Sequence, residues 1–123
     1  MIIKYNFERF TGAPARGDTR ISINRSGLIR LSAGFCRVNN ILSFKYCILF
    51  YDRSNGAIAL KFINNKEDGV LKVTKDRKAA TLAATSFIKS NKLDLRSNFK
   101  RHDWKKLSIP DVGEVFVVEL SKR

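Results

Sequence analysis

Short stretches of alternating apolar and polar residues, the pattern of half-buried β-strands, open the chain. Residues 2–10 alternate in this way, and so do residues 19–24 and 28–31. Gly27 lies between the last two stretches and can adopt a positive φ without steric cost, so these stretches are expected to form a hairpin. In that hairpin Arg30 is expected to point away from the apolar face.

A short helix is expected directly after the hairpin. Ser32 is a residue type that caps helix N-termini, and Phe35, Val38 and Leu42 follow it at the spacing of one helical face. We therefore expect a helix from Ser32 through Leu42 that buries these side chains. Arg37 falls outside this face and is expected to point toward solvent or a ligand.

The most strand-like part of the chain is residues 44–51, which are apolar on both faces except at Lys45. Residues 52–56 end in Asn-Gly, a sequence typical of hairpin turns, and residues 57–63 are expected to pair back. Because both strands are apolar on both faces, we expect this hairpin at the centre of the fold.

The second half of the chain begins after a polar hinge at residues 64–69. Residues 70–75 alternate as a strand, with Leu71 and Val73 inward. Residues 78–92 are rich in alanine and present a broad apolar face, so they predict the best helix of the chain.

The last part of the chain is expected to be mainly extended. Residues 95–107 predict a strongly basic strand and residues 108–113 a loop. Residues 114–120 predict a closing strand that contributes Val115 and Val117 to the core.

The same order of elements occurs in residues 20–63 and, less clearly, in residues 64–123. The corresponding segments are 21–23 and 71–73, 31–42 and 82–93, 46–52 and 97–103, and 58–63 and 115–120. Few residues are identical, so duplication and chance agreement both account for the pattern. We expect an α+β fold, a compact barrel-like sheet of antiparallel strands with two helices, packed as one domain. Residues 1–19 would add an N-terminal strand and a basic arm.

The first half resembles the SpoVT/AbrB swapped-hairpin DNA-binding domain. The resemblance covers residues 20–62 and rests on a strand, a turn glycine, a second strand and an apolar hairpin. The matching segments are residues 21–23, Gly27, and residues 29–31, 49–52 and 57–61. The chain departs from the family pattern at Leu28, where arginine is common, and at Ser32, where proline is common. In the family the helix often carries two arginines, and in this chain only Arg37 matches one of them.

This resemblance implies two units that interlace into one barrel, usually as a dimer. If the second half is another copy, it implies the same barrel within one chain, or a larger dimer of it. It also implies binding to double-stranded DNA.

Charge supports a polyanionic partner. Among 123 residues there are 24 Lys and Arg against 11 Asp and Glu, a formal net charge of +13. Such an excess attracts DNA, RNA or an anionic membrane surface. Membrane attachment is not expected, because no apolar run approaches the ~20 residues that span a bilayer and no signal peptide is recognisable. We expect a cytoplasmic protein whose two cysteines, Cys36 and Cys47, are reduced and buried.

The expected nucleic-acid-binding residues are the outward cations of both halves and one aromatic residue. They are Arg20, Arg25, Arg30, Arg37, Lys72, Lys75, Arg77, Lys78, Lys100, Arg101, Trp104, Lys105 and Lys106. Arg25 lies beside the turn and is expected to contact bases, since arginine can bind the guanine edge with two hydrogen bonds.

Residues 98–106 interleave aromatic and basic side chains, a pattern typical of proteins that stack on single-stranded nucleic acid. The alternative is that Phe99 and Trp104 anchor the strand in the core while the bases face water.

Catalysis is not expected. His102 and Asp103 are neighbours on an extended segment and so point to opposite faces, and the carboxylates are scattered. No cofactor or metal site is indicated, since two cysteines and one histidine cannot complete a four-ligand zinc site. We expect a DNA-binding regulator of the AbrB type, with a homodimer one of the assemblies open to it. The alternatives are a single-stranded DNA- or RNA-binding protein, or a module that binds an acidic protein or a polymerase.

Overall fold

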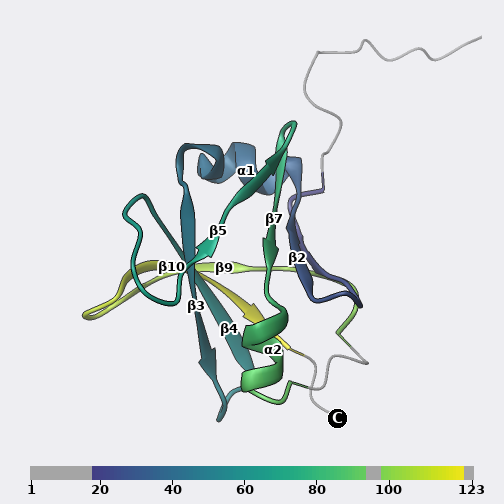
Figure 1. Cartoon of the computed structure of the whole chain (residues 1–123), viewed down its shortest axis with the longest axis vertical. Coiled ribbons are helices and arrows are strands. Elements are labelled where there is room, and N and C mark those ends of the chain that lie inside the picture. The colour runs from purple at the N-terminus through teal and green to yellow at the C-terminus, as the bar shows by residue number, and fades with distance from the viewer. Residues whose placement is uncertain (1–17, 94–97, 121–123) are drawn as a thin grey trace, which may run out of the picture.

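The computed structural model describes residues 18–93 and 98–120, which form two antiparallel sheets around a shared core (Figure 1). Sheet A has the strand order β6 (Thr74–Asp76), β7 (Ala79–Ala83), β2 (Leu28–Leu31), β1 (Ile21–Ile23) and β8 (Arg101–His102). Sheet B has the order β5 (Leu71–Lys72), β3 (Tyr46–Asp52), β4 (Ala57–Ile63), β10 (Gly113–Glu119) and β9 (Lys105–Ile109). The predicted α+β class is confirmed, but the sheets do not close into the expected barrel.

The chain passes from one sheet to the other at two corners. Val73 separates β5 from β6, is almost fully buried, and its backbone N–H donates to the Lys45 carbonyl oxygen at 2.9 Å. Residues 103–104 separate β8 from β9 at the other corner, where the Trp104 indole N–H donates to the Thr19 carbonyl oxygen at 2.7 Å. Each corner therefore combines one long-range hydrogen bond with an anchoring side chain, buried for Val73 and half-buried for Trp104.

An aromatic cluster packs α1 and the second corner against sheet B. Phe35 is fully buried, and its ring centroid lies 5.0 Å from that of Phe116, 5.2 Å from that of Trp104 and 6.3 Å from that of Phe62. The Phe116 and Trp104 contacts are edge-to-face, the arrangement favoured by the ring quadrupoles. Helix α1 (Ala33–Asn39) carries Phe35 and thereby closes one end of the core.

The first half follows the predicted order, with one correction. Ser32 caps α1 as expected, because its hydroxyl accepts from the Phe35 N–H at 3.2 Å. The helix ends at Asn39, however, since Asn40 adopts φ 55°, and a short 3-10 helix, η1 (Ile41–Ser43), follows. With only two turns, α1 buries residues 34–36, and Val38, predicted to be buried, is 60% exposed.

The second half departs further from the prediction. The prediction of a helix at residues 78–92 is wrong. Residues 79–83 form the strand β7, and within this range only α2 (Thr85–Ser90) is helical. β7 lies between β2 and β6, so both its edges are paired, and these hydrogen bonds outweigh the high intrinsic helix propensity of alanine. Arg77 makes the β6–β7 turn possible with φ 57°.

Three further expectations for this half need correction. The strand predicted at residues 70–75 is divided between the sheets at Val73, and the basic strand is interrupted at the second corner. In β10 Phe116 and Val118 join the main core, whereas Val115 is fully buried, as expected, on the opposite face of the sheet, and Val117 is only half-buried. Residues 1–17 and 94–97, where the N-terminal strand and arm and the start of the basic strand were predicted, lie outside the described residues.

The element order of the two halves corresponds. A hairpin, a helix and a second hairpin occur as β1–β2, α1 and β3–β4, and again as β6–β7, α2 and β9–β10. β2 pairs with β7 and β4 pairs with β10, so equivalent strands are neighbours in each sheet. The counterpart of β3 in this order is β9, and not residues 97–103 as expected. A common origin of the halves stays a prediction.

Candidate nucleic-acid interface

Lysine side chains surround a surface pocket of about 410 Å³ at the first corner. β5 pairs with β3, which places Lys72 opposite Tyr46, and the chain then turns through Val73 into β6. The residues that line the pocket are Lys45, Tyr46, Lys72, Val73, Thr74 and Lys75. Within the described residues none of its three lysines forms an ion pair.

The β6–β7 turn adds two more free cations. Arg77 and Lys78 are exposed and, in the described part of the chain, have no carboxylate partner. This turn and α1 lie at the same end of the molecule, and α1 packs against β7 (Figure 1). Arg37 on α1 is likewise exposed and unpaired among the residues described. We name this set the basic end: Arg37, Lys45, Lys72, Lys75, Arg77 and Lys78.

Three of the predicted arginines, Arg20, Arg30 and Arg101, form ion pairs within the chain. The Arg20 Nε lies 3.0 Å from one carboxylate oxygen of Asp18, and the Arg101 Nε lies 3.2 Å from the other. Hydrogen bonds from the Arg20 backbone N–H and side chain hold the pKa of Asp18 below its ordinary value. Arg30 lies 3.9 Å from the carboxylate of Asp76. These arginines are exposed, but each has a carboxylate partner that competes with a phosphate.

Arg25 occupies the β1–β2 turn, at the end of β2 that is remote from α1. Its guanidinium lies over the Phe99 ring, 5.8 Å from the centroid. Arg25 is therefore separated from the basic end, and its contact with bases stays a prediction.

At the second corner most of the aromatic and basic residues form contacts within the protein. The Trp104 ring packs against Phe35 and Phe116 of the core, which agrees with the alternative that Trp104 anchors this segment. Lys105 lies 3.2 Å from Glu119 and Lys106 lies 3.3 Å from Glu114, so both lysines have carboxylate partners. Lys100 and Arg101 line a second pocket of about 370 Å³ beside Trp104.

The structure thus unites five of the predicted residues and adds Lys45 to them. The members predicted from sequence are Arg37, Lys72, Lys75, Arg77 and Lys78. Lys45 stood out only as the one charge in an apolar strand, and nothing in the sequence placed it near Lys72. The basic end therefore draws mainly on the second half, whereas the family resemblance pointed to the first.

Reactive chemistry has little support at the described residues. Burial raises the pKa of the Cys36 thiol to about 11 and that of Cys47 further, so both thiols are neutral near pH 7. His102 is buried, with Nε2 2.9 Å from the Asn98 carbonyl oxygen. No group of three or more potential metal ligands occurs in the described ranges, and no helix there has the length and hydropathy to span a membrane.

Comparisons of the chain with protein-family models, curated proteins and solved structures found no match.

Proposed function

We propose that this chain is a non-catalytic protein that binds double-stranded DNA through the basic end. The observation that carries the proposal is six cations without carboxylate partners among the described residues, gathered at one end of a chain of net charge +13. Free cations release the counterions of phosphates on binding, whereas an ion-paired cation must first give up its carboxylate.

The β6–β7 hairpin favours a duplex as the ligand. Its turn carries Arg77 and Lys78, and residues 76–79 extend beyond the last pair between β2 and β7, Leu31 with Ala80. The major groove of B-DNA is wide enough to admit the two chain segments of such a turn. The lysines of the corner pocket would contact the phosphates beside the groove. A role as a transcription regulator requires sequence preference, which selection from random duplexes would measure.

Single-stranded DNA or RNA is the second candidate ligand, and Tyr46 favours it. This half-buried tyrosine lines the corner pocket between lysines, where its ring could stack on an unpaired base. A single strand would also follow the pocket without needing groove geometry.

Fluorescence anisotropy with a duplex and with a single strand, each at ~50 and ~200 mM salt, tests the proposal. If the six cations of the basic end each contact one phosphate, duplex affinity should fall by about 10³ over this range. The duplex should bind more tightly than the single strand at both salt concentrations.

A matched pair of double variants locates the interface. Lys72→Gln with Lys75→Gln should weaken duplex binding and reduce the slope of log affinity against log salt by about 2, since two phosphate contacts are lost. Lys105→Gln with Lys106→Gln removes the same charge from residues that are already paired with Glu119 and Glu114, so its effect should be much smaller. Equal effects of the two variants, or the absence of salt-dependent binding, would contradict the proposal.

A further inference from the structure

The face of sheet B that points away from the core is apolar and uncovered in the described structure. β4 alternates strictly, with Ile58, Leu60 and Phe62 toward the core, so Ala59 lies on the opposite face. In register, Ala59 is flanked by Phe50 on β3 and by Val117 on β10. We call this surface the outer face.

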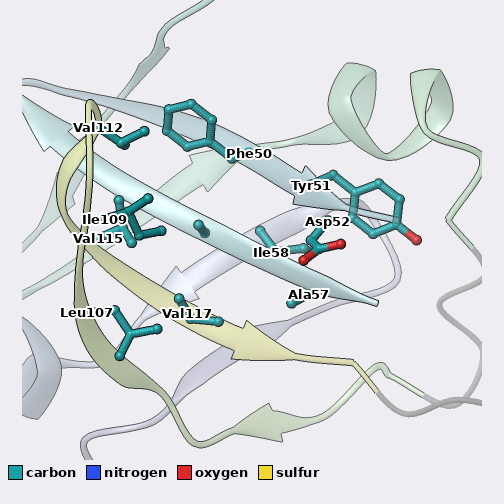
Figure 2. Close-up of a pocket in the computed structure, with 11 residues that line it drawn as sticks. Phe50, Tyr51, Asp52, Ala57, Ile58, Leu107, Ile109, Val112, Val115 and Val117 are labelled. Atoms are coloured by element: carbon teal, nitrogen blue, oxygen red, sulfur yellow. The ribbon is translucent and has the colours of Figure 1, made fainter. Parts of the chain in front are cut away.

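The outer face contains a cavity of about 270 Å³ beneath the β9–β10 hairpin (Figure 2). Leu107 and Ile109 project over it from β9, and Phe50 and Val112 lie across from one another at its edge. Val115 also lines the cavity and is fully buried, although it is not part of the main core.

Exposed hydrophobic side chains concentrate on this surface. Among the described residues four large hydrophobic side chains are exposed, and three of them line the cavity: Phe50 at 38%, Leu107 at 46% and Ile109 at 36%. The fourth, Val38, lies on α1. A contiguous apolar patch of this kind marks an interaction site more often than single exposed residues do.

The charges on the outer face indicate which partner would bind to it. Lys61, Lys72 and Lys105 lie on the outer face with the carboxylates of Asp52 and Glu119, so three positive and two negative charges nearly cancel there. Lys105 and Glu119 are already paired at 3.2 Å. Two copies of a chain with net charge +13 repel one another, and this repulsion is weakest at a nearly neutral face. An acidic partner would instead prefer the basic end.

We infer that the outer face is the interface of a homodimer in which Phe50 of each copy enters the cavity of the other. A two-fold contact requires a protruding group and its receptor on the same surface, and the outer face supplies both. Each Lys105–Glu119 pair would then lie at the rim, where it can exchange partners across the axis. This inference is independent of whether the basic end binds DNA.

Sedimentation velocity of the full chain over a range of protein concentrations tests the inference. The wild-type chain should reach twice the monomer mass of 14.0 kDa. Phe50→Asp should weaken the dimer by about 100-fold or more, because it places a buried charge at each of two equivalent contacts. Val38→Asp is the matched control, since it introduces the same charge at an exposed apolar residue outside the outer face, and it should leave the dimer intact.

A second pair of variants tests the rim without altering the cavity. Lys105→Glu places like charges beside Glu119 and should weaken the dimer, and adding Glu119→Lys should restore it. Circular dichroism verifies that each variant folds. If Phe50→Asp does not fold, Leu107→Ser takes its place in the experiment. A wild-type chain that stays monomeric at every concentration, or a dimer equally insensitive to Phe50→Asp and Val38→Asp, would overturn the inference.

Discussion

Replacing Trp104 tests whether the aromatic residue of the basic segment supports the core or binds nucleic acid. Trp104 is the single tryptophan of the chain and is half-buried at the second corner. Its ring contacts Phe35 and Phe116 edge-to-face at centroid distances of 5.2 and 5.5 Å, and its indole N–H donates to Thr19 at 2.7 Å. The structure therefore predicts a large loss of stability on truncation.

The magnitude follows from these contacts. Truncating a buried aromatic residue to alanine costs about 3–5 kcal/mol, and the half-buried position of Trp104 places it near the lower value. Trp104→Phe keeps most of the ring packing but loses the hydrogen bond to Thr19, so it should cost about 1–2 kcal/mol. The order wild type, Trp104→Phe, Trp104→Ala is expected in the free energy of unfolding.

Urea unfolding followed by circular dichroism provides the measurement. For a loss of about 3 kcal/mol the midpoint of Trp104→Ala should fall by about 1–2 M, since the slope for a chain of this size is about 2 kcal/mol per molar. Single-strand affinity of Trp104→Phe, measured well below its midpoint, should match that of the wild type. If Trp104→Ala unfolded at the wild-type midpoint while either variant lost single-strand affinity tenfold, the ring would be a ligand contact and the structural reasoning would be refuted.

Two other predictions concern a turn glycine and a buried thiol. Gly27→Ala and Gly69→Ala both introduce a Cβ at positive φ, but only at Gly27 does that Cβ meet a neighbour, 2.6 Å from the Thr85 hydroxyl oxygen. Gly27→Ala should therefore lower the free energy of unfolding by about 1–3 kcal/mol more than Gly69→Ala, and equal urea midpoints would contradict this packing. Because burial raises the pKa of Cys36 from 9.0 to about 11, the unfolded chain loses this proton first and stability should fall as pH rises between these values. Between these pH values the urea midpoint should fall less for Cys36→Ala than for the wild type. If both proteins show the same dependence of the midpoint on pH, Cys36 ionises alike in the folded and unfolded states.

Local structure in the first half was largely predictable, because neighbouring residues determine it. The alternation at residues 19–24 predicts β1, and the Asn-Gly turn between two apolar segments predicts the hairpin of β3 and β4. Ser32 predicts the start of α1 through the hydrogen bond it makes three residues later. The end of α1 was not predictable, since it depends on the left-handed conformation of Asn40.

Residues 79–83 show where local preference fails. An alanine-rich stretch suits a helix in isolation, but its strand form gains hydrogen bonds from β2, about fifty residues earlier in the chain, and from β6. In β10 the alternation was correct, yet the face was wrong, because Val115 is buried under the β9–β10 hairpin and not in the main core. Periodicity distinguishes two faces but not which of them meets the other sheet.

By itself the sequence determined the hairpins, the helix cap and the cationic excess, since each depends on residue type and on spacing of a few positions. Only the tertiary structure decided which cations are free, because pairing depends on residues far apart in the chain. Asp18 forms an ion pair with Arg101, which is far from it in the chain, whereas the turn of the chain at Val73 brings Lys45 beside Lys72 and Lys75 in a pocket whose lining contains no carboxylate. The same long-range packing leaves Phe50 exposed on the outer face of sheet B, which strand periodicity alone does not reveal.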